Sequence, residues 1–129
     1  MKRSIRMIIT LLLLTALIGT GKVSTAGLNL WQDGQVSNYP NPFDSRREST
    51  TIIYRLSGHS EVRVRIFDLF GNVVRDYPQN IVNPGTSKIV WDGTDESGQK
   101  VSMGGYLAVV EIENSNARLS SVRKIGVVH

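Results

Sequence analysis

Residues 61–72 constrain the fold more than any other stretch of this chain. Charged and aliphatic residues alternate there, in the order Glu61, Val62, Arg63, Val64, Arg65, Ile66. Successive side chains of a strand point to opposite faces, so this alternation predicts a half-buried antiparallel strand with one apolar face. Gly71 and Asn72 follow, and both tolerate the positive φ of a tight hairpin turn. We therefore expect a return strand from Val73, and residues 77–80, which include Pro78, are expected to break the pattern after it.

The rest of the chain repeats this short-strand pattern. Further β-prone runs occupy 50–56, 87–91, 106–113 and 118–128, and clusters of Gly, Pro, Asn and Ser separate them. No helical periodicity follows residue 26. Closely spaced strands of this kind predict an all-β, antiparallel β-sandwich of about seven strands. Trp91 is expected in its core, and Tyr39 and Phe43 are expected to cover the bottom of that core.

The first 26 residues have the features of a secretory signal peptide. Lys2, Arg3 and Arg6 precede an apolar block at 7–18, and small residues follow at 24–26. The block is shorter than the ~20 residues that a membrane-spanning helix needs. An uncleaved membrane anchor is the alternative, and Lys22, close to the expected cleavage site, is compatible with it.

Removal of residues 1–26 changes the size and charge of the predicted product. It leaves 103 of the 129 residues, enough for one domain, with 27–37 as a lead-in or edge strand and 38–129 as the sandwich. The leader holds four of the 15 Lys and Arg residues and none of the 11 acidic ones, so the mature chain is formally neutral. This balance gives no support for a nucleic-acid partner.

The chain contains no cysteine. Disulfides, thiolate zinc sites and a lipid-modified cysteine are therefore excluded, and stability has to come from core packing.

Three motifs, in the same order along the chain, carry a resemblance to a known family. The first comprises Tyr39, Pro40, Asn41, Pro42 and Phe43, followed by Thr51, Ile52, Tyr54 and Leu56. The second comprises Val64, Ile66, Phe67, Asp68, Gly71, Val74 and Arg75. The third comprises Trp91, Asp92, Gly93, Asp95, Gly98, Val101, Gly104 and Tyr106.

Together with a basic and apolar tail at 123–128, these motifs resemble the immunoglobulin-like domain of the flagellar hook-capping protein. They are similar also to the C-terminal sorting domains of type IX secretion cargo. The resemblance implies an immunoglobulin-like sandwich without a catalytic or cofactor site, which binds a protein partner in the envelope or outside the cell. Residues 44–48 lengthen the link after the first motif and are interpreted as a polar, exposed loop insertion. Such domains usually follow a large enzyme, adhesin or hook-cap region, so functions of those regions do not transfer.

Two function classes remain open after this resemblance. The chain is either an exported, non-catalytic module that docks onto a protein assembly, or a sorting domain that a type IX-like secretion machine reads. For docking, we expect the last strand to offer its edge to β-augmentation. The expected edge residues are Arg118, Arg123, Lys124, Ile125 and Val127.

Other chemistry has weaker candidates. Asp92, Asp95 and Glu96 could offer oxygen ligands to Ca²⁺, although Asp also caps tight turns and their spacing is not that of an EF-hand. His59 lies in a predicted turn near Ser57 and Ser60, and His129 is the last residue in the sequence, so no framework orients either ring against a nucleophile.

Two features could suit a carbohydrate ligand. Arg55, Arg63 and Arg65 could form a basic stripe for an anionic polysaccharide, or a solvated face with Glu61 and Glu113 as cross-strand partners. Trp31 could be a surface aromatic, or it could cover the core.

The leader yields a direct prediction. Because Ser24 and Ala26 satisfy the small-residue rule for cleavage, the exported protein is expected to begin at Gly27. The intact mass of the protein recovered outside the inner membrane measures this. A mass that still includes residues 1–26 would show an anchored protein.

Overall fold

The computed structural model describes residues 35–115 and 117–129. The predicted leader and most of the lead-in, including Trp31, lie outside these residues. The described residues form eight strands: β1 (Val36–Tyr39), β2 (Phe43–Asp44), β3 (Thr50–Leu56), β4 (Ser60–Asp68), β5 (Val73–Val82), β6 (Gly85–Trp91), β7 (Gly104–Glu113) and β8 (Arg118–Val128). The prediction of an all-β chain is confirmed.

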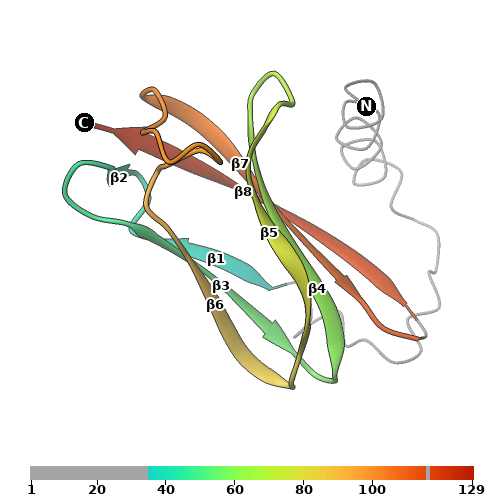
Figure 1. Ribbon diagram of the computed structural model, residues 1–129. Coiled ribbons are helices and arrows are strands. Elements are labelled where there is room, and N and C mark those ends of the chain that lie inside the picture. The colour runs from blue at the N-terminus through green and yellow to red at the C-terminus, as the bar shows by residue number, and fades with distance from the viewer. Residues whose placement is uncertain (1–34, 116) are drawn as a thin grey trace, which may run out of the picture.

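The strands form two layers, which Figure 1 shows crossing one another. One sheet has three strands in the order β1-β3-β6, and the other has five in the order β2-β8-β7-β4-β5. Every pair is antiparallel except the short pairing of β2 with β8, which is parallel. The segment that joins β1 to β2 connects the three-stranded sheet to the five-stranded sheet across one end of the sandwich.

Alternating side chains fill the space between the sheets. Thr50, Ile52, Tyr54 and Leu56 of β3 are buried, as are Val62, Val64 and Ile66 of β4, which agrees with the predicted faces. Trp91 lies fully buried among them. Its ring packs edge-to-face against Phe43 and Tyr106, with centroid distances of 5.6 and 5.5 Å. The indole N–H donates to the Thr94 carbonyl at 2.9 Å, so its polar group is satisfied inside the core.

The turn between β4 and β5 explains the second motif. One carboxylate oxygen of Asp68 accepts hydrogen bonds from the backbone N–H groups of Phe70 and Asn72, each at 2.9 Å. The other accepts one from the Asn72 side chain at 2.8 Å. Gly71 has a φ of +86°, which a residue with a side chain adopts only with strain. Asp68 and Gly71 therefore specify the hairpin.

Strand β5 corrects one expectation. Residues 77–80 were predicted to break the pattern because they include Pro78, yet β5 continues through them to Val82. It lies at the edge of its sheet, where a proline removes no ladder hydrogen bond if its nitrogen faces outward. A register shift opposite this point, between Val62 and Val64, accommodates the extra residue as a bulge.

The segment 39–43 crosses the end of the sandwich as expected, but only one of its aromatics covers the core. Phe43 is buried, whereas Tyr39 is 77% exposed. The alternation of β1 is the reason, because Val36 points inward and Tyr39 shares the outward phase of Ser37. Both peptide bonds that precede Pro40 and Pro42 are cis.

The predicted insertion at 44–48 is a compact turn. The Asp44 carbonyl accepts hydrogen bonds from the backbone N–H groups of Arg47 and Glu48. Ser45 is buried, although the segment was expected to be exposed. Its hydroxyl is hydrogen bonded to the His129 ring at 2.9 Å, which ties the turn to the chain beyond β8.

Trp91→Ala is expected to reduce the free energy of unfolding by about 3 to 5 kcal/mol, because it leaves a large cavity beside Phe43 and Tyr106. A domain of this size has only about 5 to 15 kcal/mol in total. Urea denaturation measures the loss. Val90→Ala, at a half-exposed neighbouring position, is the control and should cost less than about 1 kcal/mol. A similar small loss for Trp91→Ala would contradict the core assignment.

Candidate functional site

Strand β8 is covered at one end of its outer edge. β2 pairs with it at Val127 and Val128. Next to this pair, the side chain of Asn41 donates to the Lys124 carbonyl at 2.9 Å and accepts from the Gly126 N–H at 2.8 Å. Asn41 thus imitates a pairing strand over these residues. Sequence reasoning identified it only as part of a motif, and its contact with β8 was missed.

The rest of this edge is open. In an antiparallel pair, alternate residues direct both backbone polar groups away from the partner strand. Lys124 and Gly126 do so, and the register between β7 and β8 is continuous, so Arg118, Ser120 and Val122 do so as well. No strand of the part of the chain that the structure describes pairs with β8 before Val127. These three residues therefore present unpaired N–H and C=O groups.

The far edge of the same sheet is less accessible. On β5, the Val74 carbonyl accepts from the Glu96 N–H at 3.0 Å, and the Asp76 N–H donates to the Glu96 carboxylate. Pro78 has no N–H to offer. The loop between β6 and β7 thus closes the middle of this edge, which leaves β8 as the longer run of free backbone.

The residues that were predicted to form the edge lie in different environments in the structure. Arg118 lies on the open part and pairs with Glu113 at 2.7 Å. The Lys124 backbone is covered by Asn41, and Arg123 donates through Nε to the Val36 carbonyl. Ile125 and Val127 are buried in the core. The accessible part is therefore the N-terminal half of β8.

The basic stripe that was considered for a polysaccharide does not form, because Arg55 belongs to a different sheet from Arg63 and Arg65. The cross-strand partners also differ from Glu61 and Glu113. Arg63 pairs with Asp76 at 2.6 Å, and Arg65 pairs with Glu111 at 3.0 Å. The hydrogen bonds that Arg63 donates to Asp76 raise the pKa of Arg63 above its ordinary value, against the smaller effect of burial.

The carboxylates that were considered as calcium ligands accept hydrogen bonds from the protein itself. Asp92 accepts hydrogen bonds from the Thr94 hydroxyl at 2.6 Å and from its N–H at 3.0 Å. Asp95 accepts from the Ser97 hydroxyl at 2.6 Å and from two backbone N–H groups. The Glu96 carboxylate binds β5, as described above. Residues 35–115 and 117–129 contain no group of three or more His, Cys, Asp or Glu side chains placed to hold a metal.

The third motif places Gly93 between these turns and the core. Its φ is +78°, and a Cβ there would lie 2.7 Å from the Cβ of Ser45. A side chain at this position would therefore push the turn at 44–48 away from Phe43.

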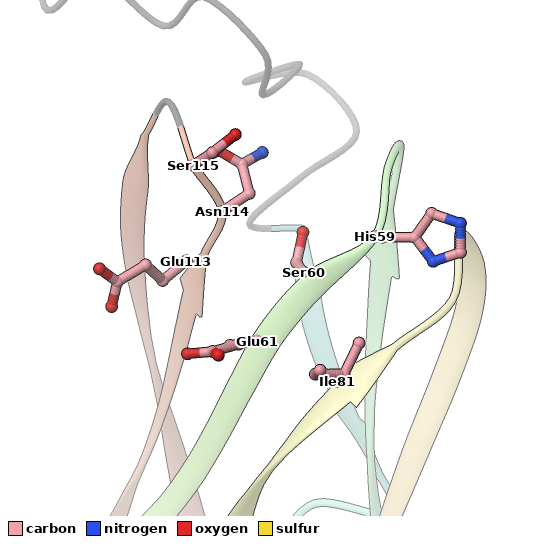
Figure 2. Close-up of a pocket in the computed structure, with 7 residues that line it drawn as sticks. All are labelled: His59, Ser60, Glu61, Ile81, Glu113, Asn114 and Ser115. Carbon is pink, nitrogen blue, oxygen red and sulfur yellow. The ribbon is translucent and has the colours of Figure 1, made fainter.

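A hollow of about 330 Å³ lies at the end of the sandwich around His59 and Ser60. Figure 2 shows the His59 ring directed away from the Ser60 hydroxyl, which donates to the Gly58 carbonyl at 3.2 Å. Glu61 and Glu113 lie opposite each other across β4 and β7, and each carboxylate has its own hydrogen-bond donor, Gln79 and Arg118 respectively. These four side chains do not form a nucleophile and base pair.

The described residues also lack any helix with the length and apolar character needed to cross a bilayer.

The two sheets, the chain crossing between them and the parallel β2–β8 pairing define an immunoglobulin-like β-sandwich. The family model for the FlgD Ig-like domain matches residues 38–116, which is more than half of the chain. The chain therefore belongs to the family of FlgD Ig-like domains. This match confirms the resemblance to the hook-capping protein, whereas the resemblance to type IX sorting domains stays a prediction.

Three solved structures are similar to the chain. Dimeric latent PorU from Porphyromonas gingivalis is 27% identical, with a TM-score of 0.58, over 72% of this chain and 9% of PorU. PorZ, a surface component of the type IX secretion system of the same organism, is 23% identical, with a TM-score of 0.53, over 86% of this chain and 13% of PorZ. FlgD from P. aeruginosa is 20% identical, with a TM-score of 0.52, over 74% of each chain.

The chain thus corresponds to a small part of PorU and PorZ. The likenesses to PorZ and FlgD show the fold alone. A comparison with curated proteins finds no match.

The Asp92 turn predicts how stability depends on pH. The hydrogen bond from the Thr94 hydroxyl lowers the pKa of Asp92 below its ordinary value of 3.8. Burial acts in the opposite direction, and the hydrogen bond from the Thr94 N–H lowers the pKa further. A lowered pKa in the folded state adds stability above the unfolded pKa, and this stability is lost as the pH falls through the folded value. Asp92→Asn keeps the acceptor oxygen but removes the charge.

The free energy of unfolding of Asp92→Asn should therefore fall less than that of the unchanged protein between pH 5 and pH 2. Urea denaturation across this range measures the difference. The pKa values of Asp68 and Asp95 are also lowered, so part of the acid sensitivity should remain. Identical pH profiles would contradict a role for the Asp92 charge.

Proposed function

We propose that this chain is an exported, non-catalytic module that docks onto a protein partner in the envelope or outside the cell through the open edge of β8. The observation that carries the proposal is the unpaired backbone of Arg118, Ser120 and Val122, in a sheet whose other edge is closed in its middle. An incoming extended segment would pair with these groups and lengthen the sheet. The predicted leader and membership of a family of interaction domains support export and docking.

The charged side chains around this edge favour pairing with a selected partner over indiscriminate pairing with other exposed strands. Arg118 and Lys124 are exposed at the two ends of the open run, and charged residues on an edge discourage aggregation. Val122 lies between them and is 36% exposed, which offers an apolar contact on the outer face of the sheet. The edge thus combines a short stretch of free backbone with a single apolar anchor.

Ser120→Cys should crosslink to the partner in a native envelope extract, because this exposed side chain lies in the middle of the open run. The chain has no cysteine of its own, so the label is unique. Asn80→Cys on β5, the opposite edge of the same sheet, is the matched control and should crosslink less. A protein that stays monomeric and uncrosslinked, with its fold intact, would count against docking.

A proline tests the pairing itself. Val122→Pro removes one outward N–H and leaves the ladder to β7 in place, since proline is tolerated where the N–H of an edge strand faces solvent. It should abolish the Ser120→Cys crosslink while the urea midpoint changes little. Val122→Ala keeps the N–H and should retain the crosslink. Equal crosslinking in both variants would mean that no strand pairs here.

A sorting domain read by a type IX-like secretion machine is the second candidate, which the resemblance of the sequence motifs to type IX sorting domains favours. Deletion of β8 cannot separate the two roles cleanly, because Ile125 and Val127 belong to the core. Val122→Pro can do so. A folded Val122→Pro protein that accumulates in the periplasm would favour sorting, whereas one that is exported but no longer docks would favour the docking role.

A further inference from the structure

The outer face of the three-stranded sheet has a composition unlike that of the rest of the molecule. β1, β3 and β6 contain no aspartate or glutamate, and their only charged residues are Arg55 and Lys88. The register aligns the outward side chains in rows: Tyr39, Thr51 and Val90; Ser37, Ile53 and Lys88; then Arg55 and Thr86. One end of the face is therefore apolar and the other is cationic.

The two cations of this face are unpaired within residues 35–115 and 117–129. Arg55 and Lys88 occupy diagonal positions on neighbouring strands, about 7 to 8 Å apart at the backbone. On the five-stranded sheet, by contrast, Arg63, Arg65 and Arg118 each have a carboxylate within 3.0 Å. Three arginines of the five-stranded sheet thus have a counter-charge, whereas Arg55 and Lys88 have none among the described residues.

A hollow at the start of β1 extends the cationic end. It has a volume of about 450 Å³, and both Arg55 and Arg123 line it, together with Ile53 and Tyr54. Its lining contains no carboxylate. Arg123 is held in place because its Nε donates to the Val36 carbonyl. A carboxylate placed in this hollow would lie between two guanidinium groups and beside apolar side chains.

The apolar end of the face is exposed. Tyr39 is 77% exposed and Val90 is 54% exposed, and they lie on either side of Thr51 in the same row. Ile53 lies in the next row, toward the cations. A ligand that covers the whole face would need apolar groups at one end and negative charge at the other.

We propose that this cationic and apolar face docks an acidic segment of a protein. Its carboxylates would lie against Arg55, Lys88 and Arg123, and its apolar side chains would lie on Ile53 and Val90. A protein segment fits better than an anionic polysaccharide because it supplies both kinds of group. Apart from Arg123, which belongs to β8, the surface is on the opposite sheet from the open edge of β8, so a partner could use either one alone.

The test uses the exported protein and a short fluorescent peptide with glutamates in one half and valines in the other. Fluorescence anisotropy should show binding that weakens as salt is added, since the charges are exposed. The double variant Arg55→Glu/Lys88→Glu should bind at least about tenfold more weakly, because each attraction becomes a repulsion. Arg46→Glu/Arg47→Glu makes the same change in net charge at exposed positions of the turn at 44–48, outside the face, and it should bind as the unchanged protein does.

Two further arms make the outcome decisive. A peptide with glutamine in place of glutamate should not bind, and equal binding of both peptides would overturn the proposal. Polygalacturonate is the polysaccharide probe, and binding of this polymer alone, lost in Arg55→Glu/Lys88→Glu, would also overturn it. If the reversed variant does not fold, Arg55→Gln/Lys88→Gln replaces it, with folding checked by urea denaturation. The Ser120→Cys crosslink is measured separately, so failure of one surface does not imply failure of the other.

Discussion

The edge-to-face packing of Trp91 against Phe43 and Tyr106 is the contact on which the rest of the structure depends. Trp91 ends β6 in the small sheet, while Phe43 begins β2 and Tyr106 lies in β7, both in the large sheet. The three rings therefore join the two layers at one end. Burial of the Trp91 ring leaves no polar group unsatisfied, because its indole N–H donates to a carbonyl in the adjoining loop.

This aromatic cluster also determines which backbone is free. Phe43 can reach Trp91 only if the chain crosses from the small sheet to the large one, and the crossing segment brings Asn41 and β2 against the C-terminal half of β8. The N-terminal half has no such cover among the described residues. Core packing and the position of the candidate docking edge are thus consequences of the same crossing.

Sequence reasoning succeeded where a residue's environment follows from its immediate neighbours. The alternation of Val62, Val64 and Ile66 and the hairpin turn at Gly71 both proved correct, because strand period and positive φ are local properties. The bounds of β8 were predicted correctly for the same reason.

It failed where the answer depended on which strands become neighbours. Arg55 was grouped with Arg63 because both occupy polar positions of an alternating strand. The sheet that a strand joins, however, depends on its pairing with strands that are distant in the sequence. Pro78 was taken as a breaker because its place at an edge could not be known. Contacts such as that of Asn41 with β8 join residues more than 80 positions apart, and no local pattern reveals them.

The closed middle of β5 has a consequence for assembly. A sheet with two open edges can add copies of itself without limit, which is the geometry of a fibre. Here Glu96 and Pro78 obstruct one side of the large sheet, while β8 offers the other. A second copy that paired through its own β8 would leave only the obstructed β5 edges outside, so growth of this sheet would end after a single step.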